Sequence, residues 1–152
     1  MPFSEAVPKA QAYPKGAGSS SSLLRGLQVL LVDDDTDTRN LVTSVLQQFG
    51  ATVTVVASVR KALSAIEKSP PDVLLSDIGM PEEDGYTLIR EVRNLEPEVG
   101  GQIPAIALSA YVREQDCTRA LESGFQMYVT KPVEPAKLID AITKLAQTNC
   151  TL

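Results

Sequence analysis

The chain has 152 residues, 43% of them hydrophobic, which is enough for one domain with a buried core. Its 14 basic and 19 acidic residues give a net charge of −5, which offers no support for a nucleic-acid-binding surface. Histidine is absent, and this excludes His-based catalytic triads, His-ligated zinc and a phosphohistidine within the chain.

The sequence also argues against insertion in a membrane and against export. No apolar run reaches the roughly 18 residues that a membrane-spanning helix needs. The first residues lack the apolar core of a secretion signal, and Cys117 and Cys150 are not in a CxxC spacing. We therefore expect a cytoplasmic protein without a disulfide framework.

The chain divides into a tail and one folded region. Residues 1–26 are rich in Pro, Gly and Ser and show no sustained hydrophobic period, which predicts a flexible N-terminal tail or linker. We expect the folded domain to span residues 27–147 and a short C-terminal tail to follow at 148–152.

In chain order, short apolar strands alternate with amphipathic helices. The predicted strands are Val29–Val32, Thr52–Val56, Val73–Asp77, Ile103–Ala110 and Gln126–Thr130. The predicted helices are Thr36–Phe49, one capped by Ser58 and halted by Pro70, one around Tyr86–Val92, Arg113–Ser123 and Pro135–Ala146. This alternation predicts an α/β fold, with a doubly wound five-stranded parallel sheet covered by helices on both sides.

Polar residues follow several of these strands. Asp33 and Asp34 come after the first strand, Asp77 ends the third, Ser109 the fourth, and Lys131 follows the fifth. Because the carboxyl ends of parallel strands lie at one edge, these side chains are expected to share a ligand site. Neighbouring strands are about 4.8 Å apart, so a long lysine side chain is needed to span two spacings.

This set of residues suits metal-assisted phosphoryl chemistry. Carboxylates so close repel one another by up to about 4 kcal/mol per pair at 4 Å, which favours a divalent cation. All-oxygen ligands with open positions suit Mg²⁺. Asp77 beside Mg²⁺ can act as a nucleophile and form an acyl phosphate, while Lys131 and Ser109 neutralise charge.

The sequence resembles the receiver domain of two-component response regulators over about Leu27 to Ala146. The residues that carry the resemblance are VDDD at Val32–Asp35, SDIGMPEEDG at Ser76–Gly85, LSA at Leu108–Ala110 and YVTKP at Tyr128–Pro132. The resemblance implies a flavodoxin-like receiver fold with strand order 2-1-3-4-5.

The resemblance also implies a metal site. Asp77 is expected to be the phosphoacceptor, and Asp34 and Asp77 are expected to bind Mg²⁺ directly. Asp33 would act mainly through water, and the backbone carbonyl of Gly79 would be a further ligand.

The remaining implied roles belong to the fourth and fifth strands. Ser109 takes the place of the Thr or Ser that follows the phosphate, and Lys131 that of the signature lysine, before Pro132 in a cis peptide. Tyr128 matches the aromatic switch of the family, although a half-buried strand aromatic is an equally good interpretation. Gly79 and Tyr111, each two residues beyond a site residue, predict slow self-hydrolysis of the acyl phosphate.

The expected function is a phosphorylation-controlled switch and not a turnover enzyme. A histidine kinase or histidine phosphotransfer protein would donate the phosphoryl group, since this chain has no histidine. The surface formed by the fourth helix, fifth strand and fifth helix would then repack. DGYTLIREVR and IPAIALSAYV resemble the receivers of hybrid histidine kinases, so a hybrid-kinase receiver and a single-domain regulator both stay open.

Several other interpretations stay open. Taken alone, Asp33 and Asp34 suit a helix cap, and Asp35 and Asp37 are interpreted as cap or solvent residues. Asp33 and Asp35 have the DxD spacing of an Mg²⁺-dependent aspartyl-nucleophile phosphohydrolase. A phosphate-independent interaction module is also possible, because a fold does not establish a function. A dinucleotide-binding domain is disfavoured, since no GxGxxG follows the first strand.

Overall fold

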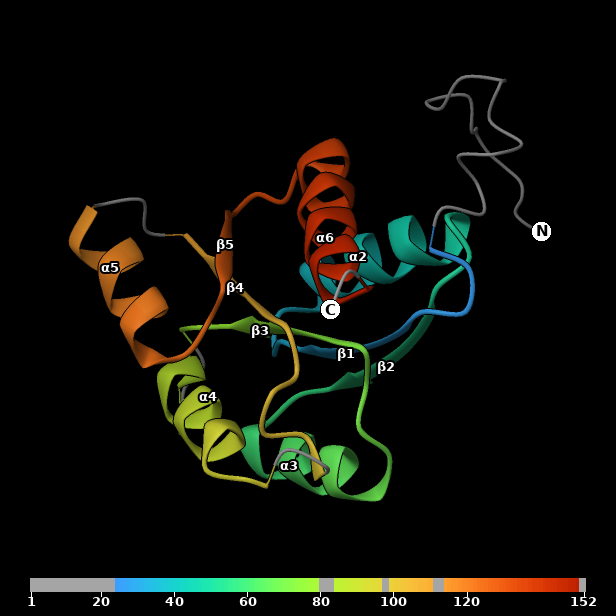
Figure 1. Ribbon diagram of the computed structural model, residues 1–152. Coiled ribbons are helices and arrows are strands. Elements are labelled where there is room, and N and C mark those ends of the chain that lie inside the picture. Colours follow the sequence, from blue (N-terminus) through green and yellow to red (C-terminus); the bar gives the residue numbers. More distant parts are fainter. Residues whose placement is uncertain (1–23, 80–83, 97–98, 111–113, 151–152) are drawn as a thin grey trace.

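In the computed structural model, residues 24–79, 84–96, 99–110 and 114–150 are described. Within them, strands and helices alternate along the chain (Figure 1). The strands are β1 (Gln28–Val32), β2 (Thr52–Val56), β3 (Val73–Asp77), β4 (Ala105–Ser109) and β5 (Met127–Thr130). The helices are α2 (Thr36–Gln48), α3 (Val59–Lys68), α4 (Gly85–Arg93), α5 (Glu114–Ser123) and α6 (Pro135–Cys150).

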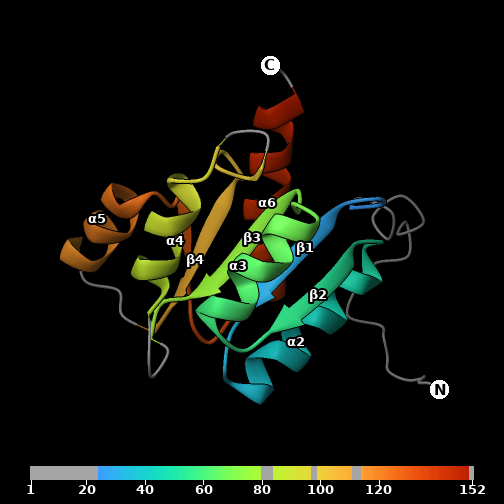
Figure 2. The ribbon, with the colours of Figure 1, turned by 90° about the horizontal axis from the view of Figure 1, so that it is seen from below.

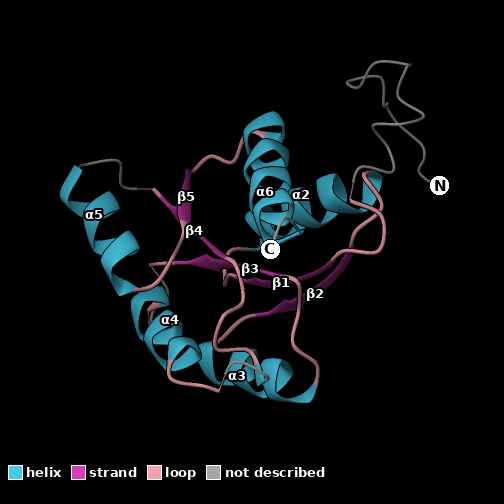
Figure 3. Ribbon diagram, in the orientation of Figure 1, coloured by secondary structure: helices cyan, strands magenta, loops and turns pink. Residues whose placement is uncertain are grey.

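The five strands form one parallel sheet in the order β2-β1-β3-β4-β5. The predicted fold class and strand order are therefore confirmed. Helices α2 and α6 cover one face of the sheet, and α3 and α4 cover the other, with α5 beside α4 (Figure 2; Figure 3). This arrangement brings all five carboxyl ends of the strands to one edge.

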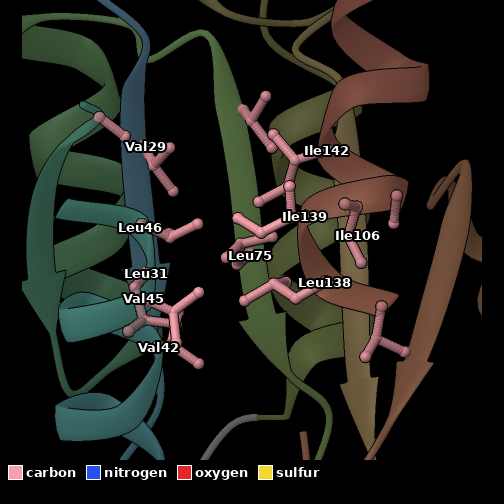
Figure 4. Packing of buried hydrophobic residues seen from close by; sticks show 14 of the residues in the cluster. Val29, Leu31, Val42, Val45, Leu46, Leu75, Ile106, Leu138, Ile139 and Ile142 are labelled. Carbon is pink, nitrogen blue, oxygen red and sulfur yellow. The ribbon is translucent and has the colours of Figure 1, made fainter. Parts of the chain in front are cut away.

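The apolar runs of the strands fill two cores, one on each face of the sheet. Along β1, Leu31 packs against α2 and α6, while Leu30 packs against α3 and α4. Figure 4 shows Leu31 and its neighbours on β3 and β4 facing Leu46 of α2 and Leu138 of α6. Each fully buried leucine stabilises the fold by about 1.5–3 kcal/mol relative to an exposed one. Because successive residues of a strand face opposite sides of the sheet, these continuous apolar runs specify a sheet covered on both sides.

The ends of the elements follow local chemistry. Asp35, Ser58 and Asp84 are the N-caps of α2, α3 and α4, where each side chain accepts a hydrogen bond from a backbone N–H three residues on. Strand β4 is shorter than predicted at both ends. Pro104, just before it, has no N–H to donate, although its carbonyl accepts a hydrogen bond from Leu74 N.

The packed part of the described chain begins slightly earlier than the sequence suggested and ends slightly later. Leu24 is buried, and its N–H donates to the carbonyl of Phe49 over 2.8 Å. Helix α6 continues to Cys150, beyond the predicted end at Ala146. The division into tail, domain and tail otherwise stays a prediction. Of the helices described, none has the length and apolar character needed to cross a membrane.

Candidate functional site

The predicted site residues lie at the carboxyl edge of the sheet. Asp33 and Asp34 directly follow β1, and Asp77 is the last residue of β3. Ser109 ends β4, and Lys131 directly follows β5. The parallel register aligns these ends, because Val32 of β1 pairs with Ser76 of β3, Asp77 with Leu108, and Ser109 with Thr130.

Three carboxylates form the acidic cluster, which we define as Asp33, Asp34 and Asp77. One oxygen from each lies within 4.8 Å of the others. Asp33 is 0% and Asp77 6% exposed, whereas Asp34 is open to solvent. Burying like charges so close together is unfavourable unless a cation compensates.

Lys131 supplies one such cation. Its Nζ lies 3.0 Å from Asp33 Oδ2 and 3.2 Å from Asp77 Oδ1, so the side chain reaches from β5 past β4 to β3 and β1. The predicted span across two strand spacings is therefore observed. Burial alone would lower the pKa of Lys131, but the contact with Asp33 and the negative charges of both aspartates outweigh burial and raise it.

Both oxygens of Asp33 are engaged within the fold. Oδ1 accepts a hydrogen bond from Asp35 N over 2.9 Å. Oδ2 is fully buried beside the Lys131 ammonium, yet it receives no well-aligned hydrogen bond from the described residues. Burial raises the pKa of Asp33, and the charge of Asp77 adds to the shift, while the Asp35 N–H and Lys131 oppose it.

The two carboxylate oxygens of Asp77 have different surroundings. Oδ1 accepts a hydrogen bond from Gly79 N over 3.2 Å and faces Lys131. From the described residues, Oδ2 receives neither a hydrogen bond nor an ion pair. The carboxylate is therefore held from one side, and its second oxygen is available to a ligand.

Two residues that sequence reasoning missed or undervalued fix the backbone of Asp77. The buried hydroxyl of Ser76 donates to the carbonyl of Asp77 over 3.0 Å. A Cβ on Gly85 would lie 2.5 Å from that same carbonyl oxygen, so only glycine fits there. The available signal for Ser76 was a hydroxyl within an otherwise apolar run. For Gly85, the sequence offers only the turn that follows the third predicted strand.

The acidic cluster has room and charge for a divalent cation. Three carboxylates and one ammonium leave a net charge of −2. Asp34 is exposed, and a Cβ built on Gly79 would meet nothing within 4 Å, so this side of the cluster is open. The all-oxygen donor set suits a hard cation such as Mg²⁺.

The other predicted residues have different surroundings. Ser109 is buried at the end of β4, and the Lys131–Pro132 peptide is cis, as predicted. Tyr128 on β5 is 42% exposed, which leaves its switch role a prediction. Tyr111 lies outside the described residues.

Comparison with known proteins gives one consistent answer. The sequence model of the family described as "response regulator receiver domain" matches residues 29–143. An uncharacterized 14.6 kDa protein from Leptolyngbya boryana is 49% identical over 84% of this chain and 92% of its own length. Hybrid signal transduction histidine kinase D from Dictyostelium discoideum is 37% identical over 86% of this chain, which spans only 9% of that kinase.

A solved structure has the same architecture. It is the receiver domain of a sensor histidine kinase from Pseudomonas aeruginosa, with a magnesium ion coordinated in its active site cleft. The two chains are 31% identical, and the match covers 80% of this chain and 98% of the other with a TM-score of 0.73.

Proposed function

The chain belongs to the response regulator receiver domain family, and on that premise we propose that Asp77 accepts a phosphoryl group from the phosphohistidine of a partner protein. The observation that carries the proposal is the position of Lys131. Its ammonium lies within 3.2 Å of Asp77 at the edge where three acidic residues from two strands converge.

The described contacts indicate which atom of Asp77 reacts. Oδ1 is held by Gly79 N and Lys131, so Oδ2 is the oxygen that attacks phosphorus. The O–P bond of an acyl phosphate forms as the P–N bond of the phosphohistidine breaks, and the departing imidazole takes up a proton. Ser76 and Gly85 hold the backbone of Asp77 in place during this step.

The acidic cluster would hold Mg²⁺ through Asp34, Asp77 and the carbonyl of Gly79, with Asp33 acting through water. Asp33 suits the indirect role, because the fold already uses both of its oxygens. When bound, the cation would neutralise charge that builds up on the phosphoryl oxygens. The magnesium ion in the similar receiver domain from Pseudomonas aeruginosa supports this assignment.

Lys131 and Ser109 would respond to phosphorylation of Asp77. In the unphosphorylated protein Lys131 binds Asp33 and Asp77. Phosphorylation would replace the single negative charge of the Asp77 carboxylate with about two charges on the phosphoryl oxygens, which would compete for this ammonium and for the Ser109 hydroxyl. The regions that carry these two residues, at the ends of β4 and β5, would then shift as a two-state element.

We propose that the phosphodonor is a histidine outside these 152 residues, since they contain none. A histidine kinase or a histidine phosphotransfer protein fits, and similarity to a hybrid histidine kinase supports that class of partner. We further propose that the protein works in the cytoplasm and is a switch, with no substrate turnover beyond its own phosphorylation and dephosphorylation.

One observation weighs against the phosphohydrolase alternative. That chemistry would need Asp35 as the second acid of a DxD pair. Asp35 instead caps α2, where its Oδ2 accepts hydrogen bonds from Thr38 N over 3.2 Å and Thr38 Oγ1 over 2.6 Å. These bonds lower the pKa of Asp35, so its carboxylate is a poor proton donor to a leaving group.

The test is incubation with acetyl phosphate and Mg²⁺, followed by intact mass measurement. We expect the wild type to gain one phosphoryl group and Asp77→Asn to gain none. Asp72→Asn is the matched control, because Asp72 accepts a hydrogen bond from Gln28 N at the opposite end of the sheet. Modification of Asp77→Asn, or steady hydrolysis of a phosphate ester by the wild type, would overturn the proposal.

A further inference from the structure

Ser76 places a hydroxyl in an apolar part of the core. It is 0% exposed and, like Leu74 two residues earlier, faces the core beneath α3 and α4. Its neighbours across the sheet are Val32 of β1 and Ala107 of β4, which belong to that same core. A buried hydroxyl is unfavourable unless it makes a hydrogen bond, and alanine at position 76 would pack as Ala107 does. Packing alone therefore does not explain the hydroxyl.

The Ser76 hydroxyl holds the peptide group that links Asp77 to Ile78. The carbonyl of this group accepts the hydrogen bond from Ser76 Oγ over 3.0 Å. The N–H of the same group, on Ile78, donates to Leu108 O of β4 over 3.0 Å. Hydrogen bonds at both ends therefore fix the orientation of this peptide plane.

Gly85 lies against the same carbonyl but cannot replace the Ser76 bond. A Cβ at Gly85 would lie 2.5 Å from the Asp77 carbonyl oxygen, so the α-carbon of Gly85 packs close to that oxygen. The N–H of Gly85 already donates to Ile78 O over 3.0 Å. Without the Ser76 hydroxyl, the Asp77 carbonyl would face an apolar group on this side.

The peptide group that Ser76 holds lies between the two residues on which the proposed chemistry depends. Asp77 precedes it and provides the attacking Oδ2. Gly79 follows one residue later, where its N–H holds Asp77 Oδ1 over 3.2 Å and its carbonyl is a proposed Mg²⁺ ligand. A rotation of the peptide plane would move these groups relative to one another. A displacement of about 1 Å at a reacting group can slow a reaction about a hundredfold.

We propose that Ser76 is a positioning residue for the phosphorylation of Asp77. By orienting the Asp77–Ile78 peptide group, its hydroxyl directs Asp77 Oδ2 toward the phosphoryl group and the Gly79 carbonyl toward the cation. Ser76 is fully buried, so it acts through Asp77 and Gly79 and takes no part in the bonds that form and break. This role rests on the proposed function and adds to it a residue that supports both reacting centres.

The test measures phosphorylation of the full chain by acetyl phosphate, with intact mass, over a range of Mg²⁺ concentrations. Ser76→Ala should react about tenfold more slowly at saturating Mg²⁺ and should need about threefold more Mg²⁺ for half its maximal rate. Ser76→Cys keeps a side chain of similar size but is a weak donor, so it should behave like Ser76→Ala. Ser58→Ala is the matched control, because it removes a hydroxyl that accepts a backbone hydrogen bond at the start of α3. It should react at the wild-type rate.

A second measurement separates positioning from a loss of stability. In a ¹H–¹⁵N spectrum, the amide resonance of Gly79 reports its hydrogen bond to Asp77 Oδ1. This resonance should shift in Ser76→Ala and stay in place in Ser58→Ala. All rates are compared at a temperature at which circular dichroism shows each variant to be folded.

Three results would overturn the role of Ser76. One is a wild-type rate in folded Ser76→Ala and Ser76→Cys. Another is an equal loss of rate in Ser58→Ala, which would make the effect one of stability. A third is an unshifted Gly79 resonance in a slow Ser76→Ala variant. If the wild type itself gains no phosphoryl group on Asp77, the proposed function fails too, whereas a reactive wild type with an equally fast Ser76→Ala refutes only the role of Ser76.

Discussion

Charged side chains lie partly or fully buried at both ends of the sheet, but they have different partners at the two ends. At the amino end, Arg93 lies among carbonyl oxygens and donates four hydrogen bonds to them. At the carboxyl end, Asp33 and Asp77 share one ammonium, and Asp33 Oδ2 is buried without a well-aligned hydrogen bond from the described residues.

The two ends of the sheet are therefore expected to have different roles, the amino end in stability and the carboxyl end in phosphoryl chemistry. A half-buried charge with four hydrogen bonds to acceptors stabilises the fold around it. A cluster with excess charge of one sign does not stabilise the fold. Such a cluster persists only where the surrounding core holds its side chains in place. The account therefore predicts that substitutions at the amino end reduce stability and that substitutions at the carboxyl end reduce phosphorylation.

The largest expected effect is that of Lys131→Met. Loss of the ammonium removes the protein charge that faces Asp77, so the rate of phosphorylation by acetyl phosphate should fall about a hundredfold. The measurement is the initial rate of phosphorylation by intact mass, at a saturating Mg²⁺ concentration, with folding checked by circular dichroism. A folded variant that reacts at the wild-type rate would contradict the role of Lys131.

Arg93→Met is the matched substitution at the other end. It leaves the carbonyl of buried Gly101 and that of half-buried Gly124 without their Arg93 donor, so the free energy of unfolding should fall by about 2–3 kcal/mol. Urea denaturation measures this change. The phosphorylation rate at a temperature where the variant is folded should stay within about threefold of the wild type, a range set by the weak coupling between distant sites. If the folded Arg93→Met variant were phosphorylated about a hundredfold more slowly than the wild type, the predicted difference between the two ends of the sheet would be wrong.

The pH dependence of stability should reveal the excess charge. Because the pKa of Asp33 is raised above its ordinary 3.8, the native state holds this proton more tightly than the unfolded state. The contribution of Asp33 to stability is therefore greatest at low pH and is lost as the pH rises through the raised value. In a chelating buffer, the free energy of unfolding of wild type minus Asp33→Asn should fall over this range. If the difference in free energy of unfolding between the wild type and Asp33→Asn rose with pH instead, the pKa of Asp33 would be lowered in the native state, contrary to the prediction.

The smallest predicted effect belongs to a helix cap that makes no contact with either group of charged residues among the interactions described. Ser58→Ala removes the side chain that accepts a hydrogen bond from Lys61 N at the start of α3. The free energy of unfolding should fall by about 1 kcal/mol, and the phosphorylation rate should not change. Thermal denaturation and the acetyl phosphate assay test both halves of this prediction. An altered rate would mean that α3 contributes to the site.

The sheet and the positions of the site residues were predictable from local pattern. Apolar runs such as that of β3 are long enough to specify strands buried on both faces, and parallel strands bring their carboxyl ends together. The reach of Lys131 followed from strand spacing together with the strand order that the family resemblance implied.

The hydrogen bonds of Arg93 were not predictable in this way. Their acceptors come from Gly101, Gly124 and Gln126, which no sequence period connects to Arg93. The roles of Ser76 and Gly85 also depend on how closely α4 approaches Asp77 in three dimensions. Local propensities specify elements, whereas contacts between distant segments emerge only once the elements pack.

The central claim is that the carboxyl end of the sheet carries an acyl phosphate on Asp77. The most direct measurement is reduction of the phosphorylated wild type with borohydride, which converts an aspartyl phosphate to homoserine, followed by peptide mapping. We predict homoserine at position 77 and no conversion of Asp33 or Asp34. Homoserine at either of those positions, or none in a protein that has gained a phosphoryl group, would contradict the account.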